Sequence, residues 1–229
     1  MHEWYAAPME GLTGWRWRQV QHEMFGRAAL YVTPFVSPNG NFSFQRKELE
    51  ELDPERNRGI PVVPQILTNR AEYFVWAAKE CRSRGWAQVD LNLGCPSGTV
   101  TGKKKGAGLL RQPELLRQLL DGIFDALPDM KISVKTRIGW ERAEEWPALL
   151  ALLETYPICR LTVHPRVRTQ FYKGTADREV FRWTAEHTAL PLCYNGDVTT
   201  VRDLWEMGEA FPDDAVMVGR GLVADPSLL

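Results

Sequence analysis

Cys95 is the residue of this sequence best placed to carry chemistry. It lies between Gly94 and Pro96 at the end of an apolar run, and the lysines at 103–105 follow in a glycine-containing stretch. A thiol at the tip of a strand can act as a nucleophile or as a proton donor. A nucleophile would need a nearby base, and His164 lies two predicted strands further on, so both roles stay open. The lysines form either a solvated loop face or a positive patch for a polyanionic substrate.

Polar or special residues end nearly every apolar run of the chain. Lys135 lies in the alternating segment 133–139, and a lysine that points into a barrel is costly to bury unless it meets a negative group. A cofactor's phosphate or electron-rich ring could be that group, whereas a lysine at the strand's rim would reach solvent. The residues at the run ends are Met9 and Glu10, Gln65, Asn92, Lys135 and Arg137, His164 and Arg166, Asn195 and Gly196, and Gly219 and Arg220.

Two glycine-containing segments, 194–197 (YNGD) and 218–221 (VGRG), follow the last two apolar runs. Glycine allows close backbone approach, and exposed amides there can hold a phosphate. Barrels often bind phosphate at the loops after these two strands. The same sequences are also common in tight turns. On a barrel fold, we predict a phosphate site that includes Arg220.

Eight β-rich runs alternate with helical stretches, which predicts parallel βαβ units. A (β/α)8 TIM barrel needs this number of strands and fits the length of the chain, and its active site lies at the carboxyl ends of the strands. The eighth helix is expected to be truncated or missing, because little sequence follows the last run. The runs are 3–9, 29–36, 60–67, 87–94, 131–138, 159–166, 190–197 and 214–221, and the helical stretches are 69–85, 112–127, 141–156, 177–188 and 199–210.

The composition is that of a globular protein of 229 residues, with 44% hydrophobic residues and a formal net charge of −1. The near-neutral charge argues against a whole-molecule field for nucleic acid, although local basic patches remain possible. The four cysteines form no C-x-x-C pair, so neither structural zinc nor a disulfide framework is expected, and no metal site is predicted. No apolar run is long enough to span a membrane and no signal peptide is recognisable, so a cytoplasmic location is expected.

Several motifs, in order along the chain, resemble those of the tRNA-dihydrouridine synthases, which are flavin enzymes with a barrel fold. The resemblance covers essentially the whole sequence. The motifs are APMEGLTG (7–14), VDLNLGCPSGTVTGKKKGAGLL (89–110), SVKTRIGW (133–140), LTVHPRVRTQFYKG (161–174), YNGDV (194–198) and VMVGRG (216–221).

The resemblance implies FMN as cofactor, NADPH as reductant, and reduction of the C5=C6 bond of a uridine in tRNA. Cys95 would be the general acid that protonates C5 while hydride from the reduced flavin reaches C6. The target base would have to leave its stack to enter the pocket. The implied cofactor-binding residues are Pro8, Met9, Glu10, Gln65, Lys135, His164, Asn195, Gly196, Asp197, Gly219 and Arg220. The implied substrate-binding residues are Asn92, Arg137 and Tyr172 at the uracil, with Lys103, Lys104 and Lys105 on the RNA backbone.

Residues 1–229 are expected to form one FMN-binding barrel domain. Family members usually continue into a helical domain that helps to bind tRNA, and this sequence stops before it, as a fragment or a shortened protein would. Two other functions stay open. An FMN barrel could reduce a free pyrimidine or another small molecule, and a catalytically silent remnant could only bind RNA. Dependence of flavin oxidation on tRNA distinguishes the first alternative, and a colourless purified protein would indicate the second.

Overall fold

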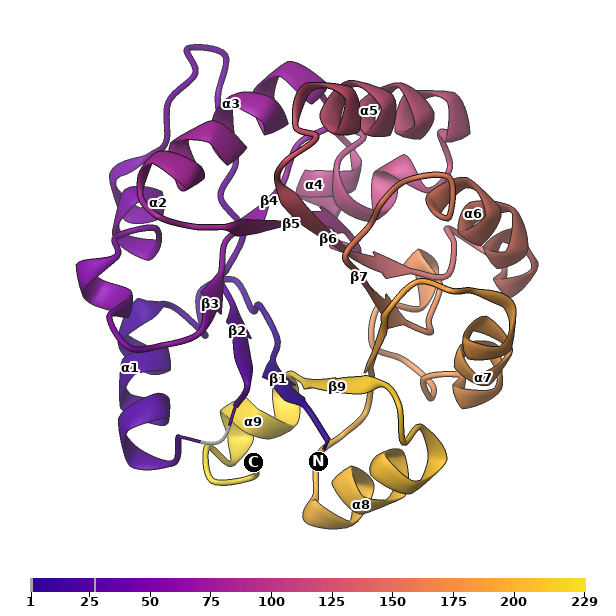
Figure 1. Cartoon of the computed structure of the whole chain (residues 1–229). Coiled ribbons are helices and arrows are strands. Elements are labelled where there is room, and N and C mark those ends of the chain that lie inside the picture. The colour runs from indigo at the N-terminus through magenta and orange to yellow at the C-terminus, as the bar shows by residue number, and fades with distance from the viewer. Residues whose placement is uncertain (1, 27) are drawn as a thin grey trace.

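The strands form one parallel sheet that curves into a barrel, with the helices outside it (Figure 1). The computed structural model describes residues 2–26 and 28–229. The strand order is β3-β2-β1-β9-β8-β7-β6-β5-β4. The two ends of this order, β3 and β4, are separated in sequence only by Pro64, so the chain itself closes the ring. The (β/α)8 barrel expected from the sequence is confirmed.

Each of the eight predicted runs contains strand structure, and the third contains two short strands. Proline has no backbone N–H to donate, and Pro64 interrupts this run. The next amide, that of Gln65, donates instead to Oγ1 of Thr33 at 3.0 Å. The strands are β1 (Trp4–Ala6), β2 (Leu30–Val32), β3 (Val62–Val63), β4 (Gln65–Ile66), β5 (Gln88–Leu93), β6 (Lys131–Arg137), β7 (Arg160–His164), β8 (Leu192–Asn195) and β9 (Ala215–Val218).

Strand length differs between the two sides of the barrel. Strands β5, β6 and β7 have six, seven and five residues, whereas β1 and β2 have three each and β3 and β4 have two each. The register pairs Asn92 with Lys135, and Arg137 with His164. Residues predicted to form the site therefore lie side by side at the carboxyl ends of the longer strands.

The five predicted helical stretches correspond to α3, α5, α6, α7 and α8. Pro113 begins α5, and Oγ1 of Thr200 caps α8 by accepting the amide of Asp203 at 3.1 Å, as their positions in sequence predict. The helices are α1 (Trp15–Met24), α2 (Arg46–Glu51), α3 (Ala71–Ser83), α4 (Gly98–Thr101), α5 (Pro113–Ala126), α6 (Trp146–Leu153), α7 (Arg178–His187), α8 (Val201–Ala210) and α9 (Arg220–Ala224), with 3₁₀ turns η1 (Glu55–Asn57), η2 (Gly106–Leu109), η3 (Ala143–Glu145) and η4 (Arg168–Gln170).

Helix α9, which follows β9, has five residues and agrees with the short last element expected from the sequence. The residues after it pack inward, since Leu228 and Leu229 are both buried. The side-chain amide of Gln21 on α1 donates to the carbonyl oxygen of Pro226 at 3.1 Å. Within the described residues, none of the helices combines the length and apolar character needed to cross a bilayer.

Side chains alternate between the inside and the outside of the barrel wall. The larger apolar cluster fills the space between strands and helices. A smaller cluster, with Tyr5, Val32, Cys193 and Met217 among its members, uses the alternate positions of β1, β2, β8 and β9. The alternate positions of β4 to β6 carry polar residues instead: Gln65, Asp90, Asn92, Ser133 and Lys135. The barrel interior is therefore apolar on one side and polar on the side that leads to Cys95.

Candidate active site

A cavity of about 290 Å³ lies where the loops after the strands converge. Every site residue predicted from the sequence lines it, except the three lysines. These residues are Pro8, Met9, Glu10, Gln65, Asn92, Cys95, Lys135, Arg137, His164, Tyr172, Asn195, Gly196, Asp197, Gly219 and Arg220. The volume is at the small end of the range typical of ligand pockets.

Cys95 follows β5 at the wall of this cavity, and its backbone is held on two sides. Its N–H donates to Oδ1 of Asn92 at 2.9 Å, and its carbonyl oxygen accepts the amide of Ala107 at 3.1 Å. Gly106 approaches so closely that a Cβ there would lie 2.9 Å from the Cys95 carbonyl oxygen, and its φ of +54° suits glycine. The thiol is thus fixed by its main chain.

The environment of the Cys95 side chain favours the protonated thiol. Burial raises the pKa of Cys95, while the charges of Arg137 and Lys135 act in the opposite direction. At neutral pH the sulfur therefore carries its proton, and the two cations lie where they can stabilise a thiolate after proton loss. This pattern suits a proton donor better than a standing nucleophile.

Lys135 points its ammonium group into the cavity, where Nζ donates to Oδ1 of Asn195 at 2.7 Å. The amide of Asn195 is oriented in turn because its Nδ2 donates to the carbonyl oxygen of Met217 at 2.8 Å. Burial, followed by the charge of Arg137, lowers the pKa of Lys135 to about 8. Lys135 is half-buried and its partner is a neutral amide, so an electron-rich or anionic ligand would be stabilised beside it.

His164 is neutral in this site. Its Nε2 lies 3.0 Å from Nη1 of Arg166, and because a guanidinium group only donates, Nε2 must accept. Burial lowers the pKa of His164 well below its usual value, and the charges of Lys135, Arg137 and Arg166 add to this effect. A neutral His164 whose Nε2 is occupied is poorly suited to act as a base toward Cys95.

Asp197 links two arginines next to the glycine segments. Its carboxylate accepts from Nη2 of Arg166 at 2.6 Å, from the amide of Ala176 at 2.8 Å and from Nη2 of Arg220 at 3.0 Å. Burial alone would raise the pKa of Asp197, but the hydrogen bonds from Arg166 and Ala176 and the two positive charges lower it. The arrangement holds the half-exposed Arg220 beside the cavity.

Arg137 is almost fully buried, and its guanidinium group joins the loop after β5 to the loop after β7. It donates to the carbonyl oxygens of Gly94 at 3.1 Å, Val167 at 3.1 Å and Phe171 at 2.7 Å. The ring of Tyr172, which is 52% exposed, lies 5.5 Å from this guanidinium carbon and 4.8 Å from that of Arg220. Tyr172 therefore presents an aromatic face between two cations at the cavity mouth.

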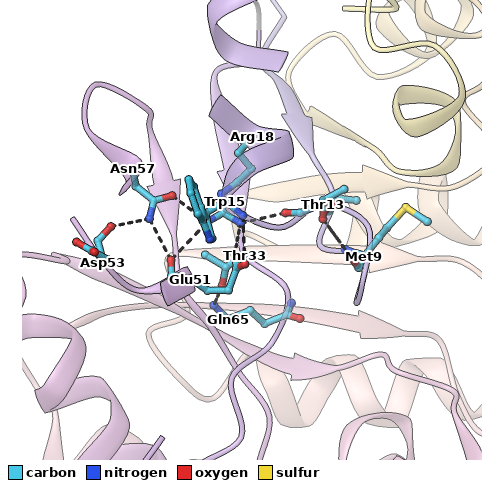
Figure 2. Close-up of polar contacts among 10 residues, drawn as sticks. Met9, Thr13, Trp15, Arg18, Thr33, Glu51, Asp53, Asn57 and Gln65 are labelled. Atoms are coloured by element: carbon cyan, nitrogen blue, oxygen red, sulfur yellow. Dashed lines mark hydrogen bonds and ion pairs between the residues drawn. The ribbon is translucent and has the colours of Figure 1, made fainter. Parts of the chain in front are cut away.

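The first loop, which carries Met9, is held by a buried ion pair that sequence reasoning missed (Figure 2). Oγ1 of Thr13 accepts the amide of Met9 at 2.8 Å, and the Thr13 carbonyl oxygen accepts from Arg18 at 3.0 Å. Arg18 also donates to the Glu51 carboxylate and to Oδ1 of Asn57, each at 2.8 Å. Arg18, Glu51, Asn57 and Thr13 thus connect α1, α2 and η1 to the cavity wall.

The lysines at 103–105 lie outside the cavity, on the loop that follows Cys95. Lys103 and Lys104 are exposed, whereas Lys105 is half-buried and its Nζ donates to Oγ of Ser37 at 3.0 Å. Burial and the charge of Lys103 lower the pKa of Lys105. Lys105 therefore ties this loop to the one after β2, and Lys103 and Lys104 are the two lysines of the run that face solvent.

Comparison with known proteins gives a consistent result. The family model described as "Dihydrouridine synthase (Dus)" matches residues 5–229. A probable tRNA-dihydrouridine synthase of Rhizobium leguminosarum bv. phaseoli is 33% identical, over 96% of this chain and 68% of the relative. The chain belongs to the dihydrouridine synthase family. A tRNA-dihydrouridine(16) synthase of Vibrio parahaemolyticus is 31% identical, over 96% of this chain and 70% of that protein.

Solved structures that are similar share the fold at low sequence identity. Histamine dehydrogenase from Rhizobium sp. 4-9 has a TM-score of 0.72 at 13% identity, over 99% of this dihydrouridine synthase family chain and 45% of that one. Morphinone reductase has a TM-score of 0.64 at 12% identity, over 99% and 84% of the two chains. These likenesses agree with the barrel described above, and the dihydrouridine synthase family assigns the chain to the flavin-dependent oxidoreductases.

The residues of this family member fit the FMN that the family implies. The ammonium group of the half-buried Lys135 contacts a neutral amide rather than a carboxylate, so it has capacity for an electron-rich ligand. Gly196, directly after β8, and Gly219, directly after β9, line the cavity together with Arg220. Backbone amides at such glycines and a guanidinium group are suitable partners for a phosphate.

Proposed function

We propose that this protein catalyses the FMN-dependent reduction of the C5=C6 bond of uridine in tRNA, which gives 5,6-dihydrouridine. The observation that carries the proposal is the protonated Cys95 thiol at the wall of a cavity that also contains the Lys135 ammonium group. Family membership supports the reaction class and the tRNA substrate.

FMN, when bound, would supply the hydride that is added to C6 of the base. The protein would bind it through the cavity residues Pro8, Met9, Glu10, Gln65, Lys135, His164, Asn195, Gly196, Asp197, Gly219 and Arg220. Lys135 and Asn195 would orient one part of the cofactor, and Arg220 with the glycines would bind its phosphate. NADPH is the proposed source of electrons.

Cys95 would hold the proton that is added to C5. Hydride addition at C6 and transfer of the Sγ proton to C5 together saturate the double bond and leave a thiolate. Lys135 and Arg137, whose charges lower the pKa of Cys95, would stabilise that thiolate until solvent restores the proton. The neutral His164 need take no part in this transfer.

The uridine would enter the cavity from a tRNA in which it has left its stack, because a base within a duplex is out of reach. Asn92, Arg137 and Tyr172 line the cavity on the side of Cys95, and we propose that they contact the base. Lys103 and Lys104 would contact RNA phosphates further along the strand. Residues 1–229 would form the catalytic domain, and the enzyme would work in the cytoplasm, where tRNA is modified.

The proposal is tested with the purified protein and tRNA that lacks dihydrouridine. We expect a flavin absorbance spectrum, and flavin reoxidation that depends on tRNA together with dihydrouridine formation. Cys95→Ala should keep bound FMN and lose at least about 100-fold in turnover, in the range that a general acid contributes. Full activity of this variant would refute the proton-donor role, and reoxidation by free uracil at the rate seen with tRNA would instead support a small-molecule reductase.

A further inference from the structure

A chain of side-chain hydrogen bonds runs inside the barrel from β6 to the backbone of Cys95. Oγ of Ser133 donates to Oδ1 of Asp90 at 2.7 Å, and Nε2 of Gln65 donates to Oδ2 of Asp90 at 2.7 Å. Nδ2 of Asn92 donates to Oε1 of Gln65 at 2.7 Å. Oδ1 of Asn92 then accepts the backbone N–H of Cys95 at 2.9 Å.

The members of this chain are buried, so water offers them few alternative partners. Gln65, Asp90 and Asn92 are 0%, 3% and 7% exposed. A buried donor or acceptor that loses its partner is costly, which gives each amide a strong preference for one orientation. Oδ1 of Asn92 also accepts the backbone N–H of Gly94 at 3.1 Å, so this oxygen already has two donors.

The direction of the hydrogen bonds is fixed at both ends. The Asp90 carboxylate only accepts, and the backbone N–H groups of Gly94 and Cys95 only donate. Between them stand two amides, those of Gln65 and Asn92, and each must turn its oxygen toward Cys95 and its NH₂ group toward Asp90. Only one combination of amide orientations therefore satisfies every group.

We propose that Asp90 and Gln65 are positioning residues that act through Asn92 to hold the backbone of Cys95 in place. Asn92 then clamps the loop of the proton donor with its oxygen, which accepts the Gly94 and Cys95 amides, and the proposed contact with the base would use the second N–H of its side chain. The use of the Cys95 proton rests on the proposed function, but the clamp itself stands on the hydrogen bonds between these residues.

The proposal is tested by reversing the direction of the chain. Asn92→Asp places two carboxylates, at positions 90 and 92, on either side of one amide, and Gln65 cannot donate to both with its single NH₂ group in this arrangement. Asp90→Asn together with Asn92→Asp restores a chain in which every donor faces an acceptor. If the side-chain amide of Gln65 rotates by half a turn, its NH₂ group donates to the carboxylate at position 92 and its oxygen accepts from the amide at position 90. Asp90→Asn alone is the matched control, because its oxygen can accept from Gln65 while its NH₂ group donates to Ser133.

Hydrogen exchange of the Gly94 and Cys95 amides is the primary measurement, because it requires neither tRNA nor turnover. We expect these amides to exchange at least about 10-fold faster in Asn92→Asp, and within about threefold of the parent protein in the double variant and in Asp90→Asn. The amide of Thr101, which donates to the Ser97 carbonyl oxygen at 2.8 Å, serves as the internal reference.

Unchanged exchange at Gly94 and Cys95 in Asn92→Asp would overturn the proposal, as would a double variant that exchanges as fast as Asn92→Asp. If Asn92→Asp fails to fold, a folded double variant with protected amides supports the proposal, and an unfolded one overturns it. Loss of turnover in Cys95→Ala bears on the proposed function instead, so the two ideas fail separately.

Discussion

Replacement of Arg18 by methionine should destabilise the protein by about 3–5 kcal/mol, which is the usual cost of removing one partner of a buried ion pair. The Arg18 side chain is fully buried and donates to Thr13, Asn57 and both the carboxylate and the carbonyl oxygen of Glu51. Methionine fills much of the same space but satisfies none of these acceptors. Because the Glu51 side chain is 17% exposed, water can solvate part of the remaining charge, so we expect a value near 3 kcal/mol.

Urea unfolding followed by circular dichroism measures this change, and an FMN titration measures its effect on the site. The loop that carries Met9 depends on Thr13, so the affinity for FMN should fall together with stability. Arg18→Met combined with Glu51→Gln is the matched comparison. It removes the orphaned charge and should recover about 1–2 kcal/mol of the loss.

A loss below about 1 kcal/mol in Arg18→Met would refute the idea that this ion pair supports the first loop. The same conclusion would follow if the double variant lost as much stability as the two single variants together. Two residues that interact give a double variant whose loss of stability is smaller than that sum.

Three further predictions concern Lys135 in the cavity and two residues near it, Gly106 and Asp90. Gly106→Ala should lower the free energy of unfolding, measured with heat or urea, by about 2 kcal/mol, because φ is +54° and the new methyl group would lie 2.9 Å from the Cys95 carbonyl oxygen. In the control variant Gly98→Ala the new methyl group has nothing within 4 Å, so the change should stay within about 0.5 kcal/mol. The pKa of Lys135 is lowered to about 8, so the affinity for FMN measured by fluorescence should fall between pH 7 and pH 9, and a Lys135→Met variant with the same pH dependence would contradict this. Burial raises the pKa of Asp90 to about 6 from 3.8. Ionisation of Asp90 therefore lowers the free energy of unfolding by up to about 3 kcal/mol above pH 6, and this loss disappears below about pH 4. Asp90→Asn should therefore stabilise the protein at pH 7.5 and have little effect on stability at pH 4, and an equal change at both pH values would disprove this.

The barrel and most of the cavity follow from local sequence patterns. Each parallel strand brings its last residues to the same end of the barrel, so a polar residue after an apolar run is a good indicator of the cavity. Gln65, Lys135, Asn195 and Arg220, each at the end of a different run, all line the one cavity. The motifs that resemble a known family supplied the proposed roles, which the pattern alone could not.

Contacts between distant segments were beyond such reasoning. Helix α1 turns Arg18 and Gln21 inward and lacks an apolar stripe, so its pattern does not predict a helix with a buried face. Arg18 pairs with Glu51, which lies on another helix, and neither residue signals the other in sequence. The ammonium group of Lys105 donates to Oγ of Ser37 on another loop, a contact that the run of three lysines does not predict.

The orientation of Asn92 shows the same limitation at atomic scale. Its position in the motif marks it as a site residue, but its partners are Gln65, on another strand, and the backbone of Cys95. Which atom of an amide faces a ligand depends on such partners. A motif identifies a residue, whereas the hydrogen bonds around it decide what that residue can do.

The unequal strand lengths have a consequence for how the barrel fluctuates. Strands β5 to β7 share long ladders of hydrogen bonds, while β1 to β4 contribute only two or three residues each. Local unfolding begins where few hydrogen bonds must break, so β1 to β4 should open at a lower free energy than the rest of the sheet. Cys95 follows β5, so the thiol is anchored in the part of the sheet that opens last.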